Sequence, residues 1–268
     1  MGTRFEDAGR RLRWLLGALT RHRHPELWEL YLEERQIPHV LQRLLSRDSC
    51  GVDVGAHIGS FLSLLLKYAP DGRHVAVEAS QTRSRWLQAR FPTVDIVAKA
   101  VADRAGTGIF KEDPRLPGFS RLRMQGEAGH NLGGSEVMVT SLDDVLINRT
   151  VDLIKLDIEG GELAALRGAV DTIKKWQPVI IFECASEYSL QAVNGCRADL
   201  YHFLTDTIGY RIYGFTDFLF RKGHMEFPEF RKCGLYPFRA FNFIALPAAR
   251  NVGTGLTSVD RTLDYSGM

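Results

Sequence analysis

The 268-residue sequence contains no run of about 18 consecutive apolar residues, and its N-terminus lacks the apolar core of a secretion signal. We therefore expect a soluble protein. The sequence also contains no CxxC pair, which argues against a zinc site or a disulfide framework. Reduced thiols and a cytoplasmic location fit the four cysteines, which are Cys50, Cys184, Cys196 and Cys233.

A strong charge of one sign is also missing. The 34 basic and 32 acidic residues leave a formal net charge of +2, so we expect no nucleic-acid partner. The Arg-rich start is the exception, because arginines alternate there with apolar residues at helical spacing. Residues 1–48 are predicted to be a helical extension that caps the domain or a partner subunit. A homo-oligomer and peripheral contact with a membrane surface or glycolipid stay open.

Strands and helices alternate from residue 50 onward, which predicts a doubly wound α/β domain with a mostly parallel sheet over residues 49–250. A loosely held tail is expected over 251–268. The expected strands are 50–54, 74–78, 94–98, 151–157, 178–184, 210–215 and 241–246, and the alternation also returns at 136–140. The expected helices after the first glycine-bearing turn are 82–90, 162–176 and 197–208.

Between residues 111 and 135 the sequence shows no period and contains several prolines and glycines. So long a connection is usually functional or mobile. We expect a loop there that can close over a polyhydroxylated acceptor. His130 lies within it and is a secondary candidate for a general base.

The turn after the first strand carries Asp53, Gly55 and Gly59, and Glu78 ends the next strand. Ligands of open parallel sheets bind at the carboxyl ends of the strands. A glutamate at this spacing can accept hydrogen bonds from both hydroxyls of a ribose. The dinucleotide pattern G-x-G-x-x-G is absent, so the turn favours a nucleotide-like ligand without a pyrophosphate.

A second strand-to-helix turn carries Asp157, Glu159 and Glu162. The strand-end position favours a functional role for Asp157 and Glu159. Glu162 is equally well explained by the preference of a helix N-terminus for acidic side chains. These oxygens could also hold a divalent cation, since hard cations prefer carboxylates.

Five segments resemble the FkbM-type methyltransferase family, in the same order along the chain. The resemblance spans roughly residues 50–246. Two departures are His57, where the family usually has Asn, and Ala79-Ser80 after Glu78, where it usually has Pro. The matching segments are VDVGAHIG (52–59), TSLDD (140–144), IKLDIEGGE (154–162), LRGA (166–169) and PVIIFE (178–183).

The resemblance implies a class I methyltransferase fold, with a seven-stranded sheet whose last strand is antiparallel. It also implies S-adenosylmethionine as cofactor and O-methylation, often of sugar hydroxyls in glycolipids, polysaccharides or natural products. Asp53 would then meet the amino-acid part of the cofactor, directly or through water. The general base is expected first at Asp157 or Glu183, each at a strand end, with Glu159 beside them. The expected cofactor contacts are Asp53, Gly55, Ala56, His57, Gly59, Ser60, Glu78, Ala79, Ser80, Ala100, Val101 and Asp157.

Three other hypotheses about the function remain. An NAD-dependent oxidoreductase would use Glu78 equally well but lacks the pyrophosphate glycines. A cofactor-binding protein without turnover would not need Asp157, Glu159 and Glu183. An N-methyltransferase would be expected to carry an Asn-Pro-Pro-Tyr-like sequence where residues 157–160 stand.

Overall fold

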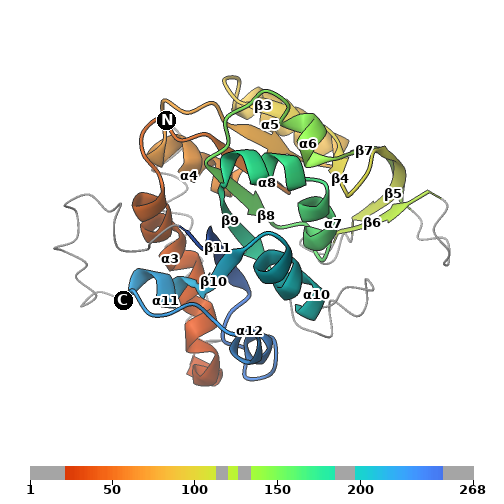
Figure 1. The fold of residues 1–268 in the computed structure, drawn as a ribbon. Helices are drawn as coiled ribbons and strands as arrows, with labels where there is room; N and C mark the ends of the chain where they lie inside the picture. The colour runs from red at the N-terminus through yellow and green to blue at the C-terminus, as the bar shows by residue number, and fades with distance from the viewer. Residues whose placement is uncertain (1–21, 113–119, 126–133, 185–196, 250–268) are drawn as a thin grey trace.

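The large sheet has the strand order of a class I methyltransferase. A computed structural model describes residues 22–112, 120–125, 134–184 and 197–249, and Figure 1 shows its two sheets with helices packed around them. The seven strands of the large sheet run in the order β10-β11-β9-β8-β1-β2-β3. All pairs from β3 to β9 are parallel, and β11 is antiparallel to both of its neighbours. The predicted fold class is therefore confirmed. The strands are β1 Gly51–Val54, β2 Val75–Val77, β3 Asp95–Val97, β8 Leu153–Leu156, β9 Val179–Glu183, β10 Tyr210–Gly214 and β11 Asn242–Pro247.

Helices cover both faces of this sheet, which explains why strands such as β9 are apolar at almost every position. The two faces form separate cores. One core packs against α6 Leu142–Val145, α7 Glu162–Arg167, α8 Val170–Trp176, α10 Arg197–His202 and α12 Phe227–Cys233. The other packs against α3 Trp28–Leu44, α4 Ser60–Tyr68, α5 Gln81–Arg90 and α11 Phe215–Leu219. Short helical turns at η1 Pro25–Leu27 and η2 Phe203–Thr207 complete the order. Within the described ranges, no helix is both long and apolar enough to cross a bilayer.

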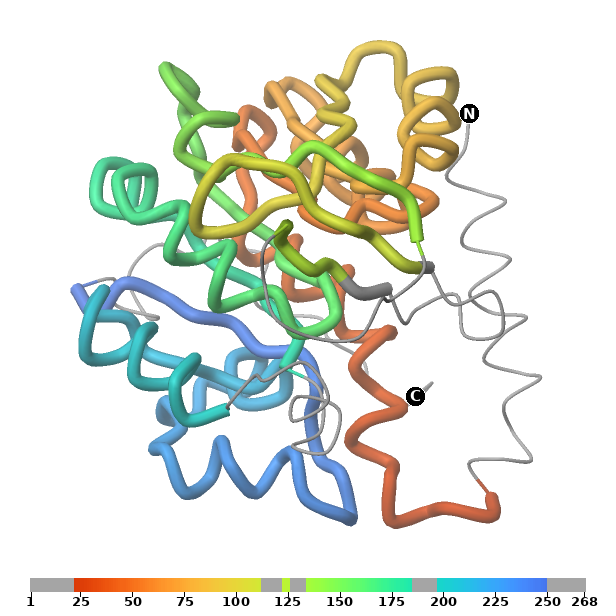
Figure 2. Tube along the Cα trace, turned by 90° about the vertical axis from the view of Figure 1, so that its right-hand side faces the viewer, coloured from red at the N-terminus to blue at the C-terminus, as the bar shows by residue number. Residues whose placement is uncertain are grey.

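The prediction of an irregular loop over 111–135 is wrong at its two ends, which belong to β5 and β7, and in its middle, where β6 forms a strand. A second sheet has the order β4-β7-β5-β6, and Figure 2 shows it in yellow to green in front of the large sheet. Its glycines lie where backbones approach closely: a Cβ on Gly108 would lie 2.7 Å from the carbonyl oxygen of Arg123, and one on Gly134, within the predicted loop, would lie 2.5 Å from that of Phe110. Glycines in a strand can mark such an approach rather than a loop. The strands are β4 Ala100–Val101, β5 Gly106–Glu112, β6 Ser120–Met124 and β7 Ser135–Thr140.

The single helix predicted over 162–176 is two helices, α7 and α8, separated at Gly168. A Cβ on Gly168 would lie 2.3 Å from the carbonyl oxygen of Ala102, so this glycine allows the chain to pass close to the second sheet. The Gly168 carbonyl also accepts a hydrogen bond from the Asp143 amide at 2.8 Å. The break therefore fastens α7 against the neighbouring segments.

The described part of the N-terminal extension is packed against the α/β domain. Buried Glu33 of α3 accepts hydrogen bonds from the amides of Phe241 and Asn242, at 2.9 and 3.0 Å, and from the Asn242 side chain at 2.8 Å. Gln36 donates to Thr216 at 2.8 Å. The boundary predicted near residue 49 stays a prediction, but the segments on its two sides share a packed interface.

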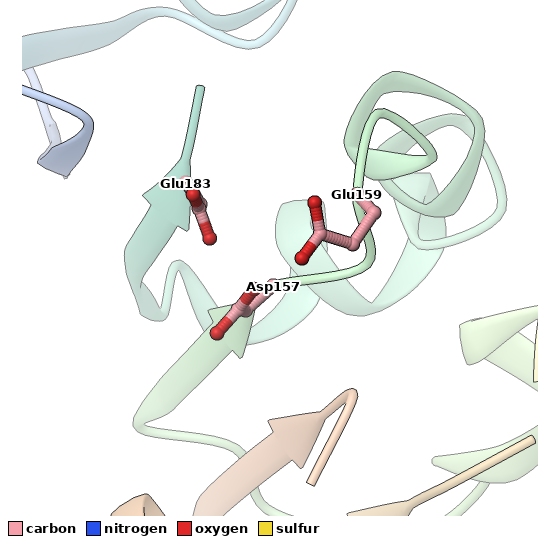
Figure 3. Close-up of side chains that lie close together, drawn as sticks. All are labelled: Asp157, Glu159 and Glu183. Atoms are coloured by element: carbon pink, nitrogen blue, oxygen red, sulfur yellow. The ribbon is translucent and has the colours of Figure 1, made fainter. Parts of the chain in front are cut away.

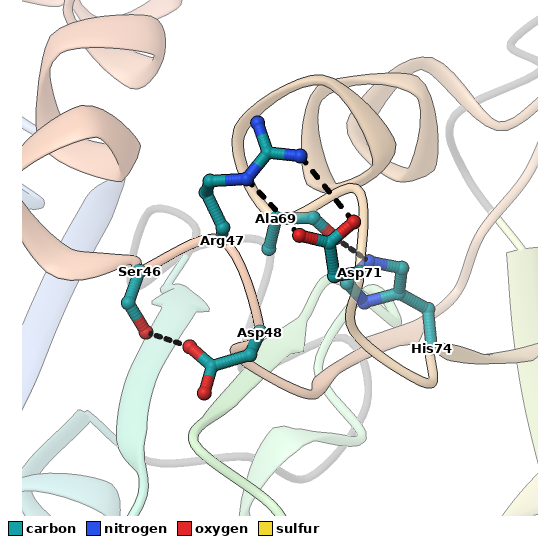
Figure 4. Close-up of polar contacts among 6 residues, drawn as sticks. All are labelled: Ser46, Arg47, Asp48, Ala69, Asp71 and His74. Atoms are coloured by element: carbon teal, nitrogen blue, oxygen red, sulfur yellow. Dashed lines mark hydrogen bonds and ion pairs between the residues drawn. The ribbon is translucent and has the colours of Figure 1, made fainter.

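The connection from α3 into β1 depends on a buried histidine (Figure 4). His74 Nδ1 accepts a hydrogen bond from the Gly51 amide at 3.1 Å, and Nε2 lies 2.8 Å from the Ala69 carbonyl oxygen. A carbonyl only accepts, so this pair of contacts requires the neutral ring with its proton on Nε2. On the surface beside it, Arg47 pairs with Asp71 at 3.0 Å.

His74 predicts a pH dependence of stability. Burial lowers the pKa of His74 below its usual value near 6.5. Its contribution to stability is therefore complete above pH 6.5 and is lost as the pH falls, because the unfolded chain binds the proton more readily. His74→Leu leaves the Gly51 amide and the Ala69 carbonyl without this partner, and we expect a loss of about 1–3 kcal/mol at pH 7.5.

The free energy of unfolding, measured by urea denaturation at pH 7.5 and pH 5.5, checks this expectation. The loss caused by His74→Leu should be smaller at pH 5.5 than at pH 7.5. The exposed residue His24 supplies the control, since His24→Leu should leave both values almost unchanged. An equal loss at the two pH values would contradict the role given to the neutral ring.

Candidate active site

A cavity of about 660 Å³ lies at the edge where β1, β2 and β8 end. The turns that follow these three strands form its floor. Phe110, Leu122 and Met124 of the second sheet border it, as do Glu34 and Ile37 of α3. The cavity thus lies where an open parallel sheet binds its ligands.

The turn after β1 adopts backbone conformations that favour glycine. Gly55 and Gly59 have φ values of +77° and +80°, and His57 between them has +50°. The close approaches are internal rather than toward the cavity: a Cβ on Gly55 would lie 2.0 Å from the carbonyl oxygen of Asp157, and one on Gly59 would lie 2.4 Å from the Phe91 ring. Gly55 therefore allows the turns after β1 and β8 to touch, and Gly59 packs away from the cavity.

Glu78 joins the turns after β1 and β2. Its buried carboxylate accepts hydrogen bonds from the His57 amide at 2.8 Å and the Ser80 amide at 2.9 Å, and Arg83 lies 3.8 Å away. A carboxylate has about four acceptor sites, more than these two backbone bonds require. Glu78 also borders the cavity, so it combines a structural role with the ability to meet ribose hydroxyls.

A charged row crosses the sheet beneath the cavity. Asp53 of β1 and Lys155 of β8 are register partners, and Lys155 Nζ lies 3.4 Å from Asp53 Oδ1 and 3.0 Å from Asp157 Oδ2. Burial opposes the charge of Lys155, but Asp157 and Asp53 outweigh it and raise the pKa of the ammonium. Lys155 was not among the residues predicted from the sequence, although a lone lysine within the apolar strand Leu153–Leu156 was a signal for a functional role.

Three carboxylates gather where β8 and β9 end (Figure 3). One oxygen each of Asp157, Glu159 and Glu183 lie within 4.8 Å of one another. Burial raises the pKa of Asp157, but Lys155 and a hydrogen bond with Glu183 outweigh this and leave it below its usual value. Burial and the charge of Asp157 raise the pKa of Glu183 to about 10. Near neutral pH, Asp157 is therefore ionised and Glu183 protonated.

Glu159 lies between these extremes. Burial, together with repulsion from Asp157 and Glu162, raises the pKa of Glu159 to about 7. A carboxylate with this pKa can take up and release a proton near neutral pH, as a general base requires. Asp157, Glu159 and Glu183 could also hold a divalent cation through their oxygens.

A family model described as "Methyltransferase FkbM domain" matches residues 53–215. The chain belongs to the FkbM methyltransferase family. Membership of this family supports an S-adenosylmethionine-dependent methyltransferase and favours it over the NAD-dependent oxidoreductase.

Solved structures with the same fold are distant in sequence. The FkbM methyltransferase of Methylobacillus flagellatus KT is 20% identical with a TM-score of 0.47, over 75% of this chain and 44% of that one. The chain thus spans less than half the length of that protein. An O-methyltransferase of Bacillus cereus, solved with S-adenosylhomocysteine (SAH), is 12% identical with a TM-score of 0.40, over 78% of this chain and 77% of that one. The sugar N-methyltransferase KedS8 of Streptoalloteichus sp. is 13% identical with a TM-score of 0.32, over 58% of this chain and 49% of that one. No curated protein matches.

The cavity of this methyltransferase fits S-adenosylmethionine in chemistry. The cofactor carries an adenosine, a sulfonium cation and a zwitterionic amino acid. The cavity borders Glu78 on one strand end and Asp157 on another, with Lys155 beside it. Burial raises the pKa of the fully buried Asp53 carboxylate, and the Lys155 ammonium, 3.4 Å away, opposes this rise.

The structure settles the open role of Glu162. Its buried carboxylate accepts hydrogen bonds from the amides of Ile158 and Gly160, at 3.0 and 3.3 Å. These bonds hold a strained turn, because Glu159 has φ +56° and Gly160 +99°. Glu162 therefore fixes the backbone on both sides of Glu159.

Not all predicted site residues reach the cavity. Asp53 lies behind Lys155, and Glu183 lies behind Asp157. Gly59 packs on Phe91, and Ser80 accepts a hydrogen bond from the Arg83 amide at the start of α5. His130 lies outside the described residues. Those that border the cavity are Gly55, Ala56, His57, Ser60, Glu78, Ala79, Ala100, Val101, Asp157 and Glu159.

The contact of Gly55 with Asp157 can be tested against a matched glycine. Gly209 has a similar φ of +72°, but nothing lies within 4 Å of the position of its Cβ. Gly209→Ala should therefore cost only the left-handed backbone energy, about 1 kcal/mol. Gly55→Ala adds a collision with the Asp157 carbonyl, and we expect a cost of about 2–4 kcal/mol with weakened SAH binding.

Urea denaturation and calorimetric titration with SAH measure the two effects. Equal stability losses in the two variants, with unchanged SAH affinity in Gly55→Ala, would show that the turns after β1 and β8 do not depend on this contact.

Proposed function

We propose that this methyltransferase methylates a hydroxyl oxygen of a sugar in a glycolipid, polysaccharide or glycosylated natural product. The observation that carries the proposal is Glu159, which borders the cavity beside ionised Asp157. The pKa of Glu159 is raised to about 7. A hydroxyl needs a base to remove its proton at neutral pH. The sugar class is supported by the family resemblance of the segments around Asp53 and Asp157.

S-adenosylmethionine supplies an electrophilic methyl group on a sulfonium. The residues of the chain then have two tasks. Glu78 and the turn after β1 fix the adenosine side, so that the acceptor oxygen can be aligned over the end of β8. Glu159 accepts the proton of the acceptor hydroxyl. Alignment is the larger effect, because near-attack positioning is worth about 7–11 kcal/mol, while a general base adds about 10²–10⁴-fold.

Asp157 and Glu183 set the charge around that proton transfer. Asp157 stays ionised beside Lys155, and its negative charge favours a cation in front of it. Glu183 stays protonated and donates to Asp157. A divalent cation at the three carboxylates is an addition to this scheme, to be tested together with the acceptor.

The acceptor class is tested by transfer of a labelled methyl group. Purified protein is incubated with S-adenosylmethionine carrying a ¹³C-methyl group and with panels of neutral sugars, amino sugars and small phenols, each with and without EDTA. We expect a new methoxy carbon signal with neutral sugars. An N-methyl signal confined to amino sugars would replace the proposal, and loss of the methoxy signal with EDTA would assign a cation to the site.

Two conservative variants separate the base from its neighbour. Glu159→Gln removes the base, and we expect kcat to fall about 10²–10⁴-fold. Glu183→Gln replaces a group that is already neutral, and the amide can still donate to Asp157, so kcat should fall less than tenfold. Steady-state kinetics at pH 7.5 give both values, and a larger loss in Glu183→Gln would transfer the role of base to Glu183.

The pH profile follows from the same assignment. The base must be ionised, so kcat should rise with pH through about 7 and then level off, in accord with the raised pKa of Glu159. This rising limb should persist in Glu183→Gln and disappear in Glu159→Gln. A profile that is flat between pH 6 and 8 in the wild-type protein would contradict Glu159 as the base.

A further inference from the structure

Lys155 occupies a position that the stability of the fold does not explain. It lies in the middle of a central strand, and its ammonium lies between Asp53 and Asp157 rather than in water. Replacing a buried ion pair by apolar residues of similar size is often neutral or stabilising. An ion pair built into the core next to a cavity is therefore better explained by something that the cavity binds.

The ammonium still has a donor to offer. A lysine carries three N–H donors, and of the two aspartates Asp157 lies within hydrogen-bond distance of the ammonium at 3.0 Å, while Asp53 lies 3.4 Å away as an ion-pair partner. Lys155 also borders the cavity, whereas Asp53 behind it is fully buried. Asp53 therefore acts as a fixed counterion that holds a positive charge at the cavity wall.

A helix N-terminus points to the same part of the wall. The nine-residue helix α4 begins at Ser60, which borders the cavity, and the buried Asp53 carboxylate faces the Leu62 amide of its first turn. Amides at a helix start attract anions. Lys155 Nζ lies 5.7 Å from the ring centroid of Phe61 in that first turn. The lysine and the helix start thus flank one site that suits a carboxylate.

S-adenosylmethionine carries one carboxylate, at the end opposite to its adenosine. Glu78, after β2, suits the ribose, and β1 and β8 lie next in the sheet order. We propose that Lys155, held by Asp53, binds the methionyl carboxylate of the cofactor together with the first turn of α4. The inference rests on the use of S-adenosylmethionine and not on the acceptor proposed above.

The competing explanation is that Lys155 only positions Asp157. The two explanations differ in what they predict for a ligand without a carboxylate. The decarboxylated analogue of SAH, 5′-deoxy-5′-(3-aminopropylthio)adenosine, keeps the adenosine, the thioether and the amine. A residue that binds the carboxylate affects SAH alone, while a residue that only positions Asp157 affects both ligands.

The experiment is a calorimetric titration of the full chain with SAH and with this analogue. Lys155→Met should weaken SAH binding about 10- to 100-fold, the range of a charge-assisted hydrogen bond, and change analogue binding less than threefold. Lys155→Arg should recover most of the SAH affinity. Lys99→Met is the matched control, because Lys99 also borders the cavity but follows β3, which is separated from β1 and β8 by β2. It should not discriminate between the two ligands.

Lys155→Gln serves as a second variant should Lys155→Met fail to fold, since its amide can still donate between the aspartates. It should show the same selective loss for SAH. An equal loss for both ligands, or no loss for either, would overturn the assignment. If no sugar is methylated but the Lys155 variants still lose affinity for SAH alone, the proposed acceptor is wrong and the role of Lys155 in binding the carboxylate is retained.

Discussion

The ion pair between Lys155 and its two aspartates is the interaction on which the site depends. Because Asp53 and Lys155 are register partners, the pairing of β1 with β8 brings a buried carboxylate and a buried ammonium into contact. A shift of one of these strands by one residue would move its charge to the opposite face of the sheet and separate the pair. Strand pairing, burial of the charges and the ionised state of Asp157 are therefore coupled. Any ligand that engages Lys155 also acts on the carboxylate where the chemistry is expected.

Around this pair, carboxylates hold the turns in place. Glu78 bonds the amides of His57 and Ser80, and Glu162 bonds those of Ile158 and Gly160. Both side chains are buried, so removing either would leave amides without a partner in a region that water does not readily reach. Charge-assisted bonds of this kind are stronger than those between neutral groups. The positive-φ turns after β1 and β8 can thus persist although two of their residues, His57 and Glu159, have side chains that disfavour this conformation.

The sequence was sufficient for what depends on local pattern. Apolar runs predicted all seven strands of the large sheet, and the strand-end positions of Glu78, Asp157 and Glu159 placed them at one edge. It was insufficient where a residue has two roles. Gly134 was taken as a loop signal because glycine serves both in turns and where backbones approach closely, and only tertiary contacts distinguish the two. Lys155 had no assigned role because its partner Asp53 lies 102 positions earlier in the sequence and becomes a neighbour only through strand pairing.

A second strand pairing, between β9 and β11, connects the site to the N-terminal helix α3. Asn242 of β11 is the register partner of Glu183 of β9, and it is held on its other side by Glu33 of α3. Burial raises the pKa of Glu33 to about 7, despite the three hydrogen bonds that the carboxylate accepts. A group with this pKa is partly protonated near neutral pH, which weakens its acceptor capacity at the strand edge beside Glu183. The extension is therefore in contact, through Asn242, with the strand pair that carries Glu183.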